Sequence, residues 1–159
     1  MSTCIFPGRF QPFHNGHLLV VQGMMKSCGR AVIVICTGGN DADKDLFTPE
    51  EVREMIGAAL LSEDIVDANI VECSDSESDE EWADKILEAA GRPEEAVVWS
   101  GDEKVREIFE KMDIKTQKIV HVPGIVSAEL REMLKTGDTE WRSKVPGGAM
   151  DVVWDKFKG

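Results

Sequence analysis

Short apolar runs alternate with helical segments along this chain, and this alternation restricts the fold more than any other feature. The strand-like runs consist mainly of Val, Ile and Ala with little polar alternation, which is typical of strands buried on both faces of a parallel sheet. They are Thr3–Phe6, Ala31–Thr37, Ala68–Cys73, Ala96–Ser100 and Lys118–Val122. This strand–helix order predicts an open, doubly wound sheet with right-handed crossovers.

Helical spacing of apolar residues predicts the segments between these strands. Thr48-Pro49-Glu50-Glu51 is a strong start signal, with an N-cap, Pro in the first turn and a carboxylate three residues past the cap. The predicted helices are Gly16–Ser27, Pro49–Leu61, Glu80–Ala90, Glu103–Met112, Ala128–Lys135, Glu140–Val145 and Ala149–Lys158. A length of 159 residues fits one domain. We therefore predict a single-domain, Rossmann-like α/β fold with a small helical C-terminal extension over about residues 128–159.

The composition limits the classes of partner that this protein can bind. The net charge of −12 argues against nucleic acid, which needs clustered Lys and Arg. No apolar run reaches the roughly 18 residues of a membrane span, and the N-terminus lacks a signal-peptide pattern. The four cysteines, Cys4, Cys28, Cys36 and Cys73, show no CxxC spacing. We expect reduced core thiols in a cytoplasmic protein rather than disulfides or a metal site.

The segment Gly8–His17 carries the clearest chemical signal and holds two of the three histidines. It lies between a predicted strand and a predicted helix, where unpaired N–H groups and partial positive charge bind anions. Arg9, His14 and His17 add further donors. The segments 38–45 and 74–81 follow the next two strands and are expected at the same sheet edge, where such folds bind ligands.

Gly8-Arg9-Phe10-Gln11-Pro12-Phe13-His14-Asn15-Gly16-His17 resembles the signature of the HxGH nucleotidyltransferase superfamily. In its longer form it is similar to that of archaeal-type nicotinamide mononucleotide adenylyltransferases. Further similar blocks follow in the same order: Phe47–Glu51, Trp82, Val98–Arg106, Glu129–Arg131 and Gly137–Pro146. The resemblance covers nearly the whole chain.

The resemblance implies adenylyl transfer from ATP to nicotinamide mononucleotide (NMN), giving NAD and pyrophosphate. The acceptor phosphate is already ionised at neutral pH, so direct in-line attack needs no general base and no covalent intermediate. Catalysis then depends on positioning and on stabilising charge. The resemblance also implies Mg²⁺ bound mainly through the ATP phosphates, no metal ligands from the protein, and a homo-oligomer.

The family's functional residues carry over onto matching positions. We expect the triphosphate to be bound, and the reaction catalysed, by His14, His17, Arg9, Arg131 and Lys44. The expected ATP-binding residues are Gly8, Arg9, Phe10, His14, Gly16, His17, Ser100, Gly101, Asp102, Ser127 and Arg131. The expected acceptor-binding residues are Phe13, Asp75, Asp79 and Trp82.

Three of these assignments have structural alternatives. Trp82 has helical spacing with Ile86 and fits a core position equally well. Ser100-Gly101-Asp102 is also good helix-capping chemistry. Lys44 would be unremarkable as a surface lysine.

The chain departs from the family pattern at three places. Asp79 replaces an Asn that reads the carboxamide, and a carboxylate accepts from an amide NH₂ but repels a nicotinate carboxylate. Arg53 is displaced by one position along its helix, and the hydroxyls that cap the helix near Arg131 are reduced to Ser127. Two alternatives therefore stay open: adenylyl or cytidylyl transfer to another phosphorylated small molecule (such as phosphopantetheine or glycerol phosphate), and a catalytically weak nucleotide-binding relative.

Overall fold

The computed structural model describes residues 2–38, 44–120 and 122–157. The chain forms two compact units. The sheet unit comprises Met1–Gly8, Val20–Gly38 and Asp67–His121, and the helical unit comprises Arg9–Leu19, Gly39–Val66 and Val122–Gly159. The expectation of a single domain stays a prediction.

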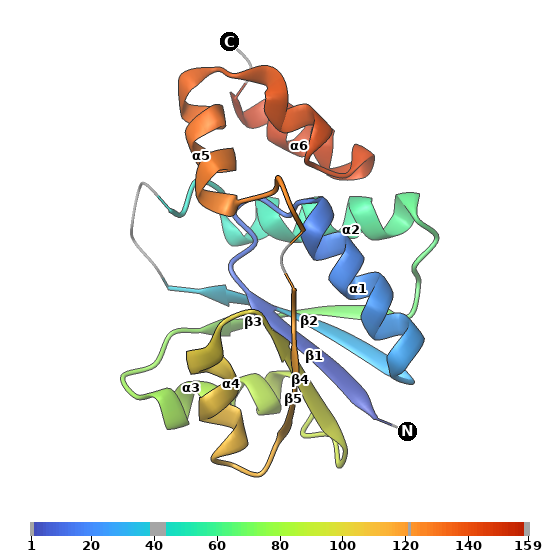
Figure 1. Ribbon diagram of the computed structural model, residues 1–159, viewed down its shortest axis with the longest axis vertical. Coiled ribbons are helices and arrows are strands. Elements are labelled where there is room, and N and C mark those ends of the chain that lie inside the picture. Colours follow the sequence, from blue (N-terminus) through green and yellow to red (C-terminus); the bar gives the residue numbers. More distant parts are fainter. Residues whose placement is uncertain (1, 39–43, 121, 158–159) are drawn as a thin grey trace. The chain divides into compact units, whose positions relative to one another are not determined.

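The sheet unit is built on five parallel strands, which confirms the predicted doubly wound, Rossmann-like fold (Figure 1). They are β1 (Thr3–Gly8), β2 (Arg30–Thr37), β3 (Ala68–Ser74), β4 (Ala96–Ser100) and β5 (Lys115–Lys118). Their order is β3-β2-β1-β4-β5, so strand addition changes direction between β1 and β4. Ile5 in the central strand opposes Val32 on one side and Val98 on the other. The carboxyl ends of β1 and β4 therefore meet at the switch point where such folds bind ligands.

Helices α3 (Asp79–Ala89) and α4 (Glu103–Glu110) cover one face of this sheet (Figure 1). Their apolar residues, including the fully buried Ile86 and Phe109, join Ile5, Val32 and Val98 in one core cluster. On the other face, a Cβ at Gly23 of helix α1 (Asn15–Ser27) would lie 3.5 Å from the Trp99 ring, so the missing side chain allows close packing. The strands β1, β2 and β4 are thus largely buried, as their apolar sequences predict.

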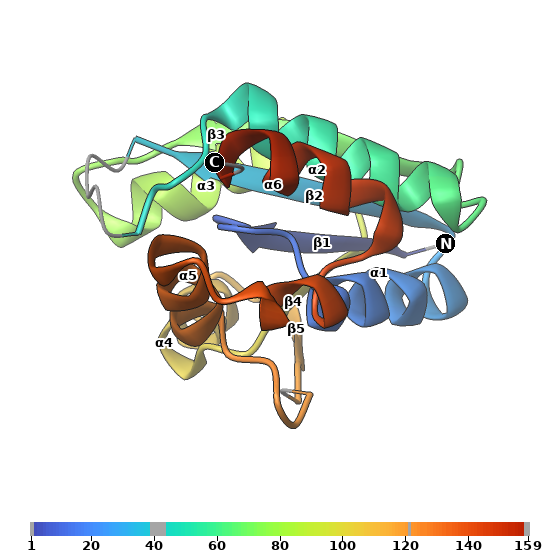
Figure 2. The same cartoon turned by 90° about the horizontal axis from the view of Figure 1, so that it is seen from above.

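The helical unit contains α2 (Pro49–Ser62), α5 (Ser127–Thr136), the 3₁₀ helix η1 (Thr139–Ser143) and α6 (Gly147–Phe157). Helix α6 packs along α2 (Figure 2). At the start of α2, Thr48 accepts from the Glu51 N–H and the Glu51 carboxylate accepts from the Thr48 N–H, so the predicted capping box is confirmed. Lys156 of α6 donates to the same carboxylate at 2.8 Å. Burial raises the pKa of Glu51, but hydrogen bonds from Lys156 and Thr48 and the Lys156 charge outweigh it, so that pKa is lowered.

Two of the predicted segments differ from those in the structure. The last strand is Lys115–Lys118, whereas the sequence predicts Lys118–Val122. Its polar residues form an exposed edge strand paired with β4 alone, and an edge strand needs no apolar signal on both faces. The segment predicted as helix Glu140–Val145 is the shorter 3₁₀ helix η1.

The cysteine expectation is wrong for two of the four residues. Cys4 and Cys28 form a disulfide, with their Cα atoms 5.8 Å apart, while Cys36 and Cys73 keep their thiols. Cys4 lies near the start of β1 and Cys28 directly follows α1, so the return of the helix alongside the strand brings the two together. The sequence gives no short-range spacing for such a pair. Cys73 fits the expectation of a core thiol, and burial raises its pKa.

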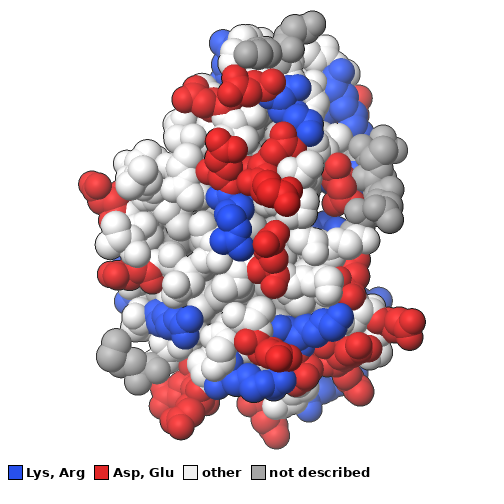
Figure 3. Space-filling model, turned by 180° about the vertical axis from the view of Figure 1, so that it is seen from behind, with Lys and Arg blue, Asp and Glu red and all other residues white. Residues whose placement is uncertain are grey.

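The surface carries mixed charge. On the face shown in Figure 3, Lys and Arg side chains stand in separate groups among Asp and Glu and form no continuous basic patch. Among the described residues, no helix has both the length and the apolar character that crossing a bilayer requires.

The disulfide predicts a specific labelling pattern. In denaturant without reductant, iodoacetamide should alkylate two cysteines per chain, Cys36 and Cys73, and after reduction it should alkylate all four. Mass spectrometry of the alkylated chain distinguishes the two states. Reduction should also lower the free energy of unfolding by about 2–4 kcal/mol, because the link constrains the unfolded chain. Four labels without reductant would contradict the disulfide.

Candidate active site

His14 and His17 form a reciprocal cap at the start of α1. The His14 N–H donates to Nδ1 of His17 at 3.1 Å, and the His17 N–H donates to Nδ1 of His14 at 3.3 Å. The two rings stack with centroids 3.6 Å apart. The arrangement copies a capping box, with histidines replacing the usual hydroxyl and carboxyl residues three positions apart. It satisfies two backbone donors that a helix start otherwise leaves unpaired.

This cap decides which ring nitrogen carries the proton. Each Nδ1 accepts a hydrogen bond from a backbone N–H, so in the neutral ring the hydrogen must lie on Nε2. Nε2 of His14 lies 3.1 Å from Oγ of Ser127, to which it donates in this tautomer. Both histidines therefore present N–H donors, which phosphate oxygens require.

Ser127 contacts His14 but does not cap its own helix. The N-cap of α5 is Val126, which makes no side-chain cap bond, whereas Ser127 occupies the first helical position. The expectation that the Ser127 hydroxyl caps this helix is therefore wrong. Its contact with the His14 ring still places it among the residues expected to bind ATP.

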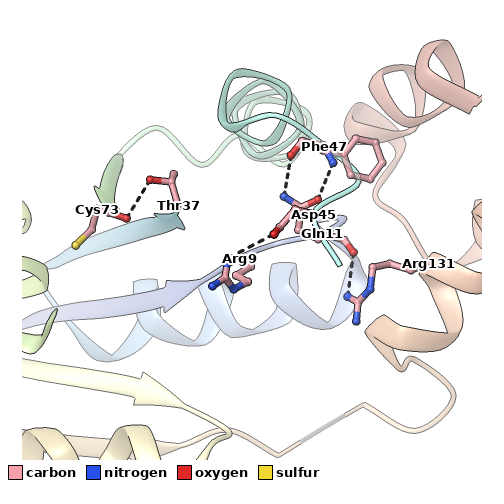
Figure 4. Close-up of polar contacts among 7 residues, drawn as sticks. All are labelled: Arg9, Gln11, Thr37, Asp45, Phe47, Cys73 and Arg131. Carbon is pink, nitrogen blue, oxygen red and sulfur yellow. Dashed lines mark hydrogen bonds and ion pairs between the residues drawn. The ribbon is translucent and has the colours of Figure 1, made fainter. Parts of the chain in front are cut away.

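Two further residues expected to bind ATP, Arg131 and Arg9, lie in the same unit (Figure 4). Nη1 of Arg131, on α5, donates to the backbone carbonyl of Gln11 at 3.3 Å. Nη1 of Arg9 lies 3.4 Å from Oδ1 of Asp45. Lys44 precedes Asp45 and is exposed. The helical unit thus holds Arg9, His14, His17, Ser127 and Arg131, and we call these five the candidate phosphate-binding residues.

The aromatic residues of the signature pack against His17. Phe10 is edge-on to the His17 ring, with centroids 5.0 Å apart, and Phe13 lies 5.5 Å from it. Phe13 has no exposed surface and Phe10 is only 3% exposed. Both rings therefore fix the orientation of His17. The ATP role expected of Phe10 and the acceptor role expected of Phe13 stay predictions.

The residues expected around adenosine belong to the sheet unit. Oγ of Ser100, at the end of β4, accepts from the Asp102 N–H at 3.1 Å, and Oδ1 of Asp102 accepts from the Lys104 N–H at 2.9 Å. Asp102 is the N-cap of α4, so the capping interpretation is confirmed. Nη1 of Arg106 donates to the Ser100 carbonyl at 2.9 Å and holds the turn. Contact with adenosine stays a prediction, which capping does not oppose.

The expected acceptor residues also lie in the sheet unit. Asp75 follows β3, and its carbonyl accepts from Nζ of Lys85 at 3.3 Å. Asp79, the first residue of α3, is exposed. Trp82 is half-buried and lies 5.8 Å from the Phe109 ring, packed against the core cluster. This position agrees with the core interpretation of Trp82, and its contact with the acceptor stays a prediction.

Gln11 is the residue that the sequence analysis overlooked. Its side-chain amide makes two hydrogen bonds to the backbone of Phe47 and is buried. The available signal was an amide within the apolar run Phe10-Gln11-Pro12-Phe13, because a buried polar side chain needs partners. Within residues 2–38, 44–120 and 122–157, no group of three or more His, Cys, Asp or Glu side chains could hold a metal ion.

Adding one methyl group at Gly16 should weaken ATP binding. A Cβ at this position would lie 2.8 Å from Cε1 and 3.0 Å from Nδ1 of His14, so Gly16→Ala should displace the His14 ring from the cap. We expect ATP affinity to fall at least about tenfold, as loss of one charge-assisted hydrogen bond of about 1.5–3 kcal/mol would require. Calorimetric titration with ATP measures this.

Gly57 of α2 offers the matched control. A Cβ there would meet nothing within 4 Å, so Gly57→Ala should leave ATP affinity unchanged and raise stability by about 0.5–1 kcal/mol. Unchanged ATP affinity in Gly16→Ala would contradict the role of the histidine cap.

A family model described as cytidylyltransferase-like matches residues 5–140. The nicotinamide-nucleotide adenylyltransferase of Pyrobaculum neutrophilum is 27% identical over 158 residues, covering 96% of this chain and 88% of the relative. The protein of the same name from Caldivirga maquilingensis is 28% identical over 164 residues, covering 100% of this chain and 90% of the relative.

A solved structure agrees with the fold. The bifunctional NMN adenylyltransferase/ADP ribose pyrophosphatase of Francisella tularensis, complexed with AMP and a manganese ion, superposes with a TM-score of 0.74 at 18% identity. The superposition covers 96% of this chain and 52% of that chain, so this chain spans about half its length. Because the family model matches most of its residues, the chain belongs to the cytidylyltransferase-like family.

Proposed function

We propose that this protein transfers the adenylyl group of ATP to NMN, giving NAD and pyrophosphate. The observation that carries this proposal is the His14–His17 cap, which fixes two Nε2–H donors in the unit that also holds Arg131 and Ser127. Such a set of donors suits a polyphosphate. The names of the archaeal relatives, which align over nearly the whole chain, support NMN as the acceptor.

The proposed reaction is a single displacement. An oxygen of the NMN phosphate attacks the α-phosphorus of ATP, the bond to the bridging oxygen breaks, and pyrophosphate leaves with that electron pair. The attacking phosphate is already an anion, so no residue needs to remove a proton. The chain's contribution is to hold the two anions in line and to donate hydrogen bonds where negative charge develops.

Four of the candidate phosphate-binding residues, together with Lys44 and Gly16, have distinct tasks in this scheme. His17 donates from Nε2 to a phosphate oxygen, and His14 does so in place of its bond to Ser127, while the backbone cap keeps both rings in the donor tautomer. Arg9 and Arg131 supply positive charge, and Lys44 adds a third cation. Gly16 leaves space next to the His14 ring.

Mg²⁺ is the proposed metal and would enter bound to ATP. The candidate phosphate-binding residues offer positive charge and N–H donors, which suit phosphate oxygens rather than a metal ion. These residues therefore fit a metal ion that is held through the nucleotide. When bound, the ion would neutralise charge on the departing pyrophosphate. The manganese ion in the Francisella structure supports use of a divalent cation.

Asp79 favours one alternative acceptor class. Its exposed carboxylate at the start of α3 replaces the amide that the resemblance leads one to expect. A carboxylate accepts from a carboxamide NH₂ but repels a second carboxylate, so nicotinamide is favoured over nicotinate. Because it cannot donate to the carboxamide oxygen, transfer to another phosphorylated small molecule is the second candidate. A cytoplasmic location and a homo-oligomeric state are also part of this proposal.

A panel of acceptors tests the function. Pyrophosphate release from ATP and Mg²⁺ should occur with NMN, and at least about tenfold more slowly with nicotinate mononucleotide, because like charges near Asp79 repel. Phosphopantetheine and glycerol phosphate, with ATP or CTP, complete the panel. Release with one of these instead of NMN would move the function to the second candidate. Release with none would identify a nucleotide-binding relative.

His17 predicts a large loss of turnover. His17→Ala should lower kcat roughly 10²–10³-fold, the usual cost of removing one donor aimed at developing charge. Because His17 also accepts the His14 N–H, this variant should lose about 0.5–2 kcal/mol of stability, as other cap residues do.

A second variant separates these effects. His17→Asn retains an acceptor for the helix start but loses the Nε2–H donor, so it should be more stable than His17→Ala and equally slow. Lys26→Ala, on the exposed last turn of α1, serves as the control with normal turnover. Near-normal turnover in both His17 variants would refute the assignment.

A further inference from the structure

The buried amide of Gln11 ties together two segments far apart in the chain (Figure 4). Its Nε2 donates to the Phe47 carbonyl at 3.0 Å, and its Oε1 accepts from the Phe47 N–H at 2.8 Å. Gln11 is 8% exposed and Phe47 is 4% exposed. The amide thus pairs with both backbone groups of one residue, as a neighbouring strand would. Loss of either bond would leave a buried polar group without its partner.

Cationic residues lie on both segments joined by this tie. Arg9 is two residues before Gln11, and Asp45, which pairs with Arg9, is two residues before Phe47. Lys44 adjoins Asp45. The segments 9–11 and 44–47 are therefore joined by two sets of contacts, one between Arg9 and Asp45 and the other between Gln11 and Phe47. The Arg9–Asp45 ion pair alone would hold the segments together weakly, because exposed ion pairs contribute little free energy in water.

Arg131, the third cationic residue, also contacts Gln11. Nη1 of Arg131 donates to the backbone carbonyl of Gln11 at 3.3 Å. Gln11 thus contacts the helix that carries Arg131 through its main chain, and the segment that carries Lys44 through its side chain.

Phe47 is also held in place by contacts other than those with Gln11. Its ring is edge-on to Phe157 of α6, with centroids 5.5 Å apart, and it precedes Thr48, the N-cap of α2. Lys156, next to Phe157, donates to Glu51 of the same capping box. Gln11 therefore joins the signature loop to the residue that leads into α2, which packs against α6.

We propose that Gln11 is a positioning residue for triphosphate binding: its amide sets the separation between Arg9, Lys44 and Arg131. Three long cationic side chains can converge on one polyanion only if their backbones are held in place. Gln11 supplies that restraint without contacting the nucleotide. This inference rests on the proposed function for its substrate, and on the contacts of Gln11 for its mechanism.

Two substitutions test this inference. Gln11→Glu keeps the acceptor but replaces the donor with an oxygen that faces the Phe47 carbonyl, and Gln11→Leu removes both bonds at similar volume. The matched controls are Gln117→Glu and Gln117→Leu, at an exposed glutamine on the edge strand β5. For each variant, calorimetry with inorganic tripolyphosphate gives Kd, and steady-state kinetics with ATP and NMN gives KM and kcat.

Both Gln11 variants should raise Kd for tripolyphosphate and KM for ATP by about tenfold or more, as loss of a buried hydrogen bond would require. KM for NMN should change less than twofold, and the Gln117 variants should match the wild type. Unfolding midpoints without ligand, together with titrations well below those midpoints, separate binding from stability.

Unchanged tripolyphosphate affinity in folded Gln11 variants would overturn the proposal. So would an equal rise in KM for ATP and NMN, because that pattern indicates a general structural role, and so would failure of the wild type to bind tripolyphosphate. If the wild type binds tripolyphosphate but transfers adenylyl to no acceptor, the proposed function fails while the Kd comparison still decides the role of Gln11.

Discussion

The central strand β1 is the constraint on which the rest of the molecule depends. It pairs with β2 on one side and β4 on the other, so its residues must be apolar and extended until the sheet ends at Gly8. The chain must then turn within a few residues to reach the start of α1. Phe10 turns with a φ of 55°, a left-handed conformation that costs a side-chain-bearing residue about 1–2 kcal/mol. The contacts of its ring with Phe13 and His17 offset this cost.

The His14–His17 pair shows how local structure and chemistry can depend on the same atoms. The spacing of three residues is what a helix cap needs, and the cap determines the tautomer of both rings. A phosphate site needs donors, and the backbone provides them indirectly by occupying each Nδ1. The order of residues in the signature therefore follows from the geometry of a helix start as much as from the ligand.

The sequence predicts those parts of the fold that arise from local rules. Four of the five strands and the capping box at Thr48 follow from apolar runs and capping chemistry, and the structure has them within a few residues. The edge strand β5 lacks that signal, because only one side of it is paired. The Cys4–Cys28 disulfide and the Gln11–Phe47 tie join residues 24 and 36 positions apart, and only the fold determines such pairs.

The disulfide closes a covalent ring that runs from Cys4 to Cys28 and contains the whole signature, from Gly8 to His17. In the unfolded, oxidised chain the histidines therefore stay tethered to the strand that precedes them and to the end of the helix that follows. The number of arrangements from which the signature must be assembled is smaller than in an open chain. The redox state of two residues outside the signature thus limits the conformational entropy of the segment that is expected to bind ATP.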